Sequence, residues 1–452
     1  ITGRNDWSST LHSSKWSYFY PSVSASILLD NLFKIRSNYI NMIKLRASWA
    51  NVGNDTSVYS LYPDYGTTDF PGGVVLPTTL PNAYIKPENC ESWEVGLDTR
   101  FFGNRLSFDL ALYQNTTTNQ IISVAQSAEI GNTSMKINAG KIRNRGIEIT
   151  LGATPVKTRD WTWTINANWS LNQNRLLALT DDWDPETPLR TGNGTTIGSR
   201  TYIYSYIGQE MHQIYGKTYN RAPKGSYYLD ENGKKVDCGG ALLINSKTGY
   251  PSLSSAPDQY IARVTPRWKA GLNTSVTWRD LTLSAQFTAQ VGGHAFSVTN
   301  FALSYQGKLK NSLPGRTDGL VLNGVVDTGD KDADGNAIYA KNTTITENVN
   351  YYYNQIKWVR DNTYENTFST DFLKLKELRI DYRLPAKLLE KTKFLRGLSV
   401  GFFATNVFCV TNWPQYDPEA AGLVSGTNIF AGIETGTFPM TRTYGFNVKL
   451  QF

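Results

Sequence analysis

The sequence predicts an all-β protein, a transmembrane antiparallel β-barrel contributing about twelve strands. Three observations predict it: apolar and polar residues alternate in many segments, the connections between them sort by length, and aromatic residues gather near segment ends. Side chains of a strand point alternately to its two faces, so each segment presents one apolar and one polar face. Lipid outside and water inside would satisfy both faces.

The strands are predicted from this alternation. It is clearest in 161–171, where three Trp, an Ile, an Ala and a Leu share one face, and it recurs at the end of the chain from Tyr444 to Phe452. In 373–384 the phase slips between Leu375 and Leu378, which predicts a β-bulge. A weaker segment opens the chain. The remaining segments with this period are 19–27, 43–49, 93–101, 106–112, 147–151, 268–278, 281–291 and 398–408.

The connections differ in length in a regular way. The short ones are 102–105, 155–160 and 278–281, and 28–42 and 385–397 are intermediate and grouped with them. The long ones are 52–91, 124–141, 180–260, 298–370 and 412–441. If all long connections lie on one rim, successive strands run strictly up and down. Outer-membrane barrels have this arrangement, with long extracellular loops and short periplasmic turns.

A soluble β-sandwich is the competing interpretation, because one alternating strand fits either fold. Only 18% of the 452 residues are charged, and the polar faces carry Ser, Thr, Asn and Gly rather than Lys and Glu. Trp at strand ends is typical of the interfacial girdles of membrane barrels. The pattern therefore favours the barrel. A soluble carbohydrate-binding β-protein stays an alternative that would purify without detergent.

Charge and cysteines constrain the partners. The net charge is +7, but Lys and Arg are scattered without a basic stripe, so nucleic acid is not an expected partner, whereas outer-membrane lipid or a negative solute fits. The three cysteines are far apart without a Cys-x-x-Cys pair, which argues against zinc. A disulfide between Cys90 and Cys238 is left open.

No catalytic constellation is found, and an enzyme is not expected. The three histidines are isolated, and no Gly-x-Ser-x-Gly or His-Glu-x-x-His motif occurs. Asp330, Asp332 and Asp334 precede Gly335 at the spacing of an EF-hand calcium loop, but position twelve is Lys341 instead of Glu. Calcium and a solvated acidic turn are both open, and the incomplete ligand set favours the turn.

Several motifs resemble those of TonB-dependent transporters. The stretch 86–96 contains Pro-Glu and then Trp-Glu-Val-Gly, and 138–148 contains Asn-Ala-Gly and then Gly-Ile-Glu. The stretches 372–385, 404–408 with 417–419, and 438–442 resemble the SusC-like (SusC/RagA) branch of that family. Together the motifs cover essentially the whole chain in the family's order.

The resemblance implies a 22-stranded barrel closed by an N-terminal plug domain. Residues 1–452 would be the C-terminal portion of that barrel, with the plug domain and the N-terminal strands absent from this chain. The implied function is TonB-dependent import of oligomeric nutrients, glycans or peptides, across the cell outer membrane. The implied partners are a SusD-like surface lipoprotein, and TonB through the missing N-terminal part. No cofactor is implied. A passive porin or structural surface barrel without energy coupling is the alternative.

Ligand contacts are expected from aromatic residues of the long connections. Aromatic faces stack on sugar rings and also hold peptides, so they leave the substrate open. Packing within the loops, or contact with the lipoprotein, is the competing interpretation for each of them. The candidates are Trp183, Tyr202, Tyr215, Tyr351, Tyr352, Tyr353, Trp413 and Tyr416.

Overall fold

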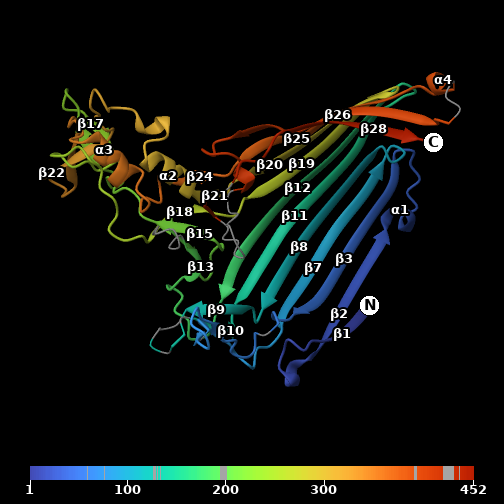
Figure 1. Ribbon diagram of the computed structural model, residues 1–452, viewed down its shortest axis with the longest axis horizontal. Coiled ribbons are helices and arrows are strands. Elements are labelled where there is room, and N and C mark those ends of the chain that lie inside the picture. The colour runs from blue at the N-terminus through green and yellow to red at the C-terminus, as the bar shows by residue number, and fades with distance from the viewer. Residues whose placement is uncertain are drawn as a thin grey trace.

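One antiparallel sheet of twelve strands dominates the computed structural model, which describes residues 1–452 except 59, 76, 126–128, 130, 133, 194–200, 391–393, 421–431 and 437 (Figure 1). Each strand pairs with the next strand of this sheet along the chain. We call this sheet the wall. Its strands are β1 (Thr2–Trp7), β2 (Ser17–Leu28), β3 (Ile40–Asn54), β7 (Glu88–Phe101), β8 (Leu106–Thr118), β11 (Lys141–Lys157), β12 (Trp161–Ala178), β19 (Trp268–Trp278), β20 (Leu281–Val291), β25 (Phe372–Arg383), β26 (Gly397–Thr411) and β28 (Thr443–Gln451).

Every predicted strand lies in the wall, and the weak opening segment is β1. Several strands are longer than their alternation indicated, and β12 continues to Ala178. The predicted bulge is confirmed, because Leu375 pairs with Phe408 and Glu377 with Thr405, which leaves Lys376 unpaired.

The five connections predicted to be long lie together at one rim, as predicted, and the shorter connection 8–16 shares that rim with them. The connections 29–39, 102–105, 158–160, 279–280 and 384–396 lie at one rim, which we call the short-turn rim. The connections 8–16, 55–87, 119–140, 179–267, 292–371 and 412–442 lie at the opposite, long-loop rim, where the small strands gather in Figure 1. Successive wall strands therefore run up and down throughout.

None of the residues that the structure describes forms a layer over the apolar face of the wall. Leu283 in β20 is 45% exposed and Phe446 in β28 is 79% exposed. A sandwich would bury both side chains against a second sheet. The apolar face is therefore the outer, lipid-facing side of a barrel wall, and the polar face is the inner side.

The long connections form a loop layer with small cores of its own. In the described part of the chain, no helix has the length and apolarity needed to cross a membrane. The helices are α1 (Leu29–Leu32), α2 (Val298–Tyr305), α3 (Val349–Tyr351) and α4 (Ala386–Leu389). The small strands are β4 (Gly66–Thr67), β5 (Val74–Val75), β6 (Thr79–Leu80), β9 (Ile121–Ala125), β10 (Ser134–Asn138), β13 (Leu189–Asn193), β14 (Tyr202–Ser205), β15 (Gln213–Gly216), β16 (Tyr227–Leu229), β17 (Lys235–Asp237), β18 (Gln259–Arg263), β21 (His294–Ser297), β22 (Val325–Lys331), β23 (Ala337–Lys341), β24 (Thr367–Ser369) and β27 (Ile433–Glu434).

The disulfide that the sequence left open is not formed. Cys90, in β7, and Cys238, in the loop layer, are both free thiols, as is Cys409. Cys238 packs in a small core with Val325 and Tyr339, so it behaves as a buried apolar side chain.

Candidate functional site

The inner face of the wall carries charges that pair across strands. Arg46 in β3 donates from Nε to Glu94 in β7 at 3.2 Å and from Nη2 to Asp109 in β8 at 3.0 Å. Gly96 makes room for this guanidinium, since a Cβ at that position would lie 2.4 Å from Arg46 Cζ. A polar, hydrogen-bonded lining of this kind suits water and a polar solute.

A hollow of about 500 Å³ lies on the inner face of the wall. Its polar lining comes from four neighbouring wall strands and from the connection that follows β26. These side chains are Glu148, Thr150, Asn168, Ser170, Lys269, Thr288, Gln290 and Glu419. The hollow therefore presents both signs of charge to a solute.

The loop layer folds over the inner side of the wall. Ile142 in β11 and Leu176 in β12 lie on the inner face at the long-loop rim, where they pack against Leu189 and Met211 of the 179–267 connection. Leu189 belongs to the four-stranded sheet β13-β14-β15-β18. This small sheet thus meets the long-loop end of the wall on both sides, since Arg263 of β18 also reaches Gln173, on the outer side of β12, through Glu210.

The two faces of the small sheet differ in composition. Ile203 and Ile214 pair across β14 and β15 and pack with Phe296 and Ile433 of two other connections. The opposite face holds Arg190, Tyr202, Tyr204, Tyr206, Tyr215 and Tyr260, which we call the tyrosine face.

The rings of the tyrosine face contact one another. Tyr202 and Tyr204 are parallel, with centroids 5.3 Å apart, and Tyr215 lies 5.5 Å from Tyr204 and 5.8 Å from Tyr260. The Arg190 guanidinium lies 5.0 Å above the Tyr202 ring. Burial raises the pKa of Tyr215 to about 12, so this phenol stays neutral. Its hydroxyl donates to Gln213 Oε1 at 3.2 Å.

The charges beside the tyrosine face are unequally neutralised. Glu210 accepts from Arg263 at 3.0 Å and from Gln173 at 3.3 Å. Arg190, by contrast, forms no ion pair with any carboxylate of the described residues, which include every Asp and Glu of the chain. The tyrosine face therefore offers a cation that is available to a ligand.

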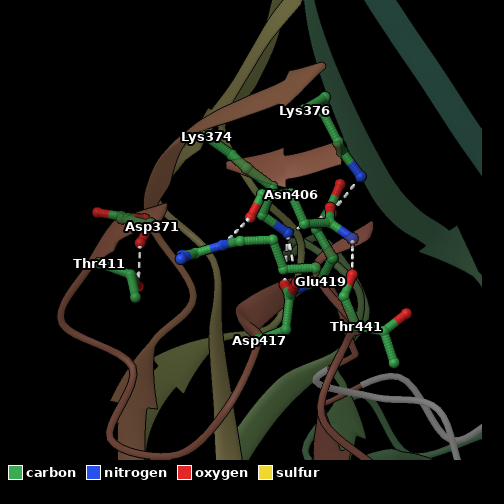
Figure 2. Close-up of polar contacts among 9 residues, drawn as sticks. Asp371, Lys374, Lys376, Asn406, Thr411, Asp417, Glu419 and Thr441 are labelled. Carbon is green, nitrogen blue, oxygen red and sulfur yellow. Dashed lines mark hydrogen bonds and ion pairs between the residues drawn. The ribbon is translucent and has the colours of Figure 1, made fainter. Parts of the chain in front are cut away.

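A buried ion cluster anchors the beginning of the 412–442 connection to the wall (Figure 2). Lys374 in β25 is 1% exposed and donates to Asp417 at 2.7 Å and to Glu419 at 2.6 Å. Lys376, the bulged residue, also bonds Glu419. Asn406 Nδ2 in β26 donates to the Thr441 carbonyl at 2.8 Å. The family-like motifs thus meet at one structural joint, a role that their sequence did not reveal.

A second anchor holds the far part of the same connection. Glu434 in β27 accepts from the Ser297 hydroxyl at 2.7 Å and from the Thr299 backbone N–H at 3.2 Å, at the N-terminus of α2. β27 also pairs with β21. The 412–442 connection is therefore fixed both to the wall and to the 292–371 connection.

Of the predicted ligand residues, the structure brings Tyr202 and Tyr215 together, as paired residues on the tyrosine face. Trp183 is partly exposed and its indole N–H donates to the Thr187 carbonyl at 2.8 Å. Tyr351 and Tyr416 are exposed in other connections. Ligand contact by each of them stays a prediction.

The other three predicted ligand residues are buried, as is Tyr215 on the tyrosine face. Tyr352 and Tyr353 form a loop core with Trp358, and burial raises the pKa of Tyr352 and of Tyr353. Trp413 packs edge-on against Phe368. Packing within the loops, the competing interpretation of the sequence, describes their environment in this structure.

The acidic turn is held by its own hydrogen bonds. Asp332 accepts from the backbone N–H of Asn336 at 2.9 Å and of Asp334 at 3.0 Å, and from the Tyr227 hydroxyl at 3.0 Å. The bond from Asn336 is the largest cause of the lowered pKa of Asp332. Among the described residues, no three acidic, His or Cys side chains are grouped to hold a metal. Calcium binding by Asp330, Asp332 and Asp334 stays a prediction.

A twelve-stranded wall with an outer apolar face, a polar lining and long loops on one rim defines a segment of a transmembrane β-barrel. Residues 1–319 match the family model described as TonB dependent receptor-like, beta-barrel. The chain belongs to this family of outer-membrane proteins, whose members act in transport rather than as enzymes.

Individual relatives agree with this assignment. The chain is 26% identical to TonB-dependent receptor P3 of Formosa agariphila, covering all of the chain and 44% of the relative. It is 23% identical to TonB-dependent receptor SusC of Bacteroides thetaiotaomicron, covering 92% of the chain and 38% of SusC. The fold is similar to that in the RagAB peptide importer, with a TM-score of 0.73 and 21% identity, over all of the chain and 45% of that one. The chain thus spans less than half the length of these relatives.

Proposed function

We propose that this chain is the C-terminal portion of the barrel of a SusC-like, TonB-dependent importer of oligomeric nutrients, glycans or peptides. The observation that carries the proposal is a polar inner wall with a loop layer folded over its mouth. Solute captured by the loop layer would meet the charged inner hollow next. The energy would come from TonB acting on a plug domain, and both lie outside residues 1–452.

Exposed apolar residues at the long-loop rim support a protein partner. In the 55–87 connection Phe70 is 81% exposed, and Tyr62, Val74 and Tyr84 are also exposed. This connection lies beyond the lipid-facing part of the wall, so these side chains would otherwise face water. A SusD-like surface lipoprotein that covers the mouth would bury them.

The test is uptake by the full-length protein in its own cells. Deletion of its gene should abolish growth on one class of oligomeric nutrient, and deletion of tonB should abolish the same growth. A variant that lacks only the TonB-contacting segment provides the matched control, because its barrel still assembles. Uptake that persists both in the tonB deletion strain and in the variant without the TonB-contacting segment would show that transport is not coupled to TonB. That result would favour a passive porin.

The sequence upstream of Ile1 and the neighbouring gene give a second test. A plug domain upstream and a lipoprotein gene alongside are the expected findings. An upstream sequence that encodes barrel strands without a plug domain would contradict the proposed domain organisation.

A further inference from the structure

The tyrosine face has the position of a capture site. Its sheet packs on the inner side of the wall through Leu189, and its other aliphatic side chains pack toward Phe296 and Ile433. The tyrosine face is the opposite face of the sheet, and its edge meets the long-loop end of β12 through Arg263, Glu210 and Gln173. Arg190 and Tyr260 are exposed on it, so a solute at the long-loop rim can reach it.

The chemistry of the face suits a sugar better than a peptide. In the described parts of its four strands, the aliphatic side chains Leu189, Ile203, Ile214 and Ile261 all lie in the clusters of the other face. The tyrosine face itself offers phenol rings, an amide and guanidinium groups. Rings with hydroxyl tips stack on and hydrogen-bond to a hydroxyl-rich sugar, and the face has no aliphatic pocket among its described residues that would hold the apolar side chains of a peptide.

Arg190 favours a ligand that carries a negative charge. The Tyr202 ring supports its guanidinium at 5.0 Å, and no carboxylate among the described residues forms an ion pair with it. A planar guanidinium held on an aromatic ring binds a carboxylate or sulfate through two parallel N–H donors. The neighbouring cation, Arg263, is already paired with Glu210.

We propose that the tyrosine face binds an anionic oligosaccharide, with Arg190 holding a carboxylate or sulfate group while the accessible rings of Tyr202, Tyr204 and Tyr260 contact the sugar and the buried Tyr215 supports them. The proposal rests on the proposed import function and narrows its substrate class. The negative group of the oligosaccharide is either a carboxylate or a sulfate, and the experiment below distinguishes the two.

The test measures binding to the full-length protein in detergent by isothermal titration calorimetry. The probes are an oligogalacturonate, a sulfated galactan oligosaccharide, a neutral galactan oligosaccharide of the same length, and an acidic peptide of the same charge. We expect one anionic oligosaccharide to bind, and the neutral sugar and the peptide to bind more weakly. Which of the two binds identifies carboxylate or sulfate as the charge.

Variants assign the binding to this face. Arg190→Gln should weaken the anionic oligosaccharide about tenfold or more, the loss typical of one charge-assisted hydrogen-bonded pair. The matched control is Arg221→Gln, because Arg221 also lies over a tyrosine ring, Tyr364 at 5.4 Å, but outside the tyrosine face. It should leave the affinity unchanged. Unaltered mobility on heating in detergent gels shows that each variant is folded.

Several outcomes would overturn the inference. These are no binding of either anionic oligosaccharide, equal binding of the neutral sugar, preference for the peptide, or an Arg190→Gln variant with unchanged affinity. The import function is tested separately by its tonB dependence. If import depends on tonB but none of these probes binds, only the proposed tyrosine-face site is rejected. If an anionic oligosaccharide binds but import does not depend on tonB, only the proposed import function is rejected.

Discussion

The wall and the loop layer are both built from β-strands, but their apolar residues face opposite ways. In the wall, residues such as Leu283 and Phe446 face outward with no protein over them, and the polar residues line the inside. In the loop layer, Ile203 and Phe296 are fully buried in small cores, and tyrosines and charges lie outside. The wall therefore depends on lipid for its apolar contacts, whereas the loop layer has an interior like that of a water-soluble protein.

The largest expected effect comes from breaking the joint between the two regions. Lys374→Met leaves Asp417 buried without its cation, which costs about 3–5 kcal/mol for such a pair. The part of the 412–442 connection around Asp417 and Glu419 should detach from the wall, while the wall stays assembled and Glu434 still holds the far part of the connection. Limited proteolysis of outer membranes should then cut this connection faster, with unchanged heat-modifiability of the barrel on gels.

The control for this joint is an exposed ion pair. Asp6→Asn breaks the Arg4–Asp6 contact in β1, which should have little effect because exposed pairs contribute little. Adding Asp417→Asn to Lys374→Met should restore part of the protease resistance, since it removes the unpaired charge. Equal proteolysis of Lys374→Met and the parent protein would show that the joint does not hold the connection.

A charged residue should be costly on the outer face of the wall, which contacts lipid, and tolerated on the inner face, which contacts water. Leu272 and Asn273 are neighbours near the middle of β19, on the outer and the inner face respectively. Leu272→Arg should cost about 2–4 kcal/mol at the bilayer midplane and reduce the folded fraction in outer membranes. Asn273→Arg should be tolerated. Similar folded fractions for both variants would contradict the assignment of the faces.

Within the loop layer, a smaller effect is expected at the second anchor. Glu434→Gln keeps the shape of the side chain but weakens the hydrogen bonds that it accepts from Ser297 and Thr299. The expected loss of stability is about 1–3 kcal/mol, the range for a buried polar group that loses a partner. Hydrogen exchange at the start of α2 should accelerate, and exchange in β19 and β20 should not. Acceleration in both regions would mean that the loop layer and the wall unfold together.

The smallest expected effect is a pH dependence of the loop layer. Burial lowers the pKa of His212, so folding disfavours its charged form. The stability that this gives is present above the ordinary histidine pKa of about 6.5 and is lost as the pH falls below it. Hydrogen-exchange protection factors in 202–216, which correct for the slower intrinsic exchange at low pH, should be smaller near about pH 5 than near about pH 7.5.

His212→Asn should remove that pH dependence. Asn tolerates the positive φ of 59° that His212 adopts, so the backbone should be kept. Exchange in the wall serves as the internal reference. The same pH dependence in the Asn variant would assign the effect to another group.

The wall could be predicted from the sequence because its signals are local. A period of two needs only neighbouring residues, and the bulge at Lys376 was visible as a phase slip between Leu375 and Leu378. The sorting of connections needs only their lengths. Outer and inner faces follow once a membrane is assumed.

The loop layer could not be predicted in the same way because its contacts join distant residues. Glu434 and Ser297 are 137 positions apart, and nothing in either stretch indicates the other. Choosing ligand residues by their aromatic type included Tyr352 and Trp413, which are buried. Residue type alone does not distinguish an aromatic side chain in a loop core from one in a binding site. The signal for the tyrosine face was the alternation of tyrosines from Tyr202 to Tyr206, a period of two inside a connection.

The grouping of the long connections constrains how such a barrel can diverge. Ile203, Phe296 and Ile433 come from three different connections and share one core, so these connections would have to be exchanged together when a barrel acquires a new specificity. The connections 55–87 and 119–140, joined by the pairing of β6 with β10, form a second set, which contacts the first through Ile122 packed on the cluster of Leu189 and Met211. The strand register beneath both sets is held by the continuous pairing of the wall strands and would survive an exchange of the connections.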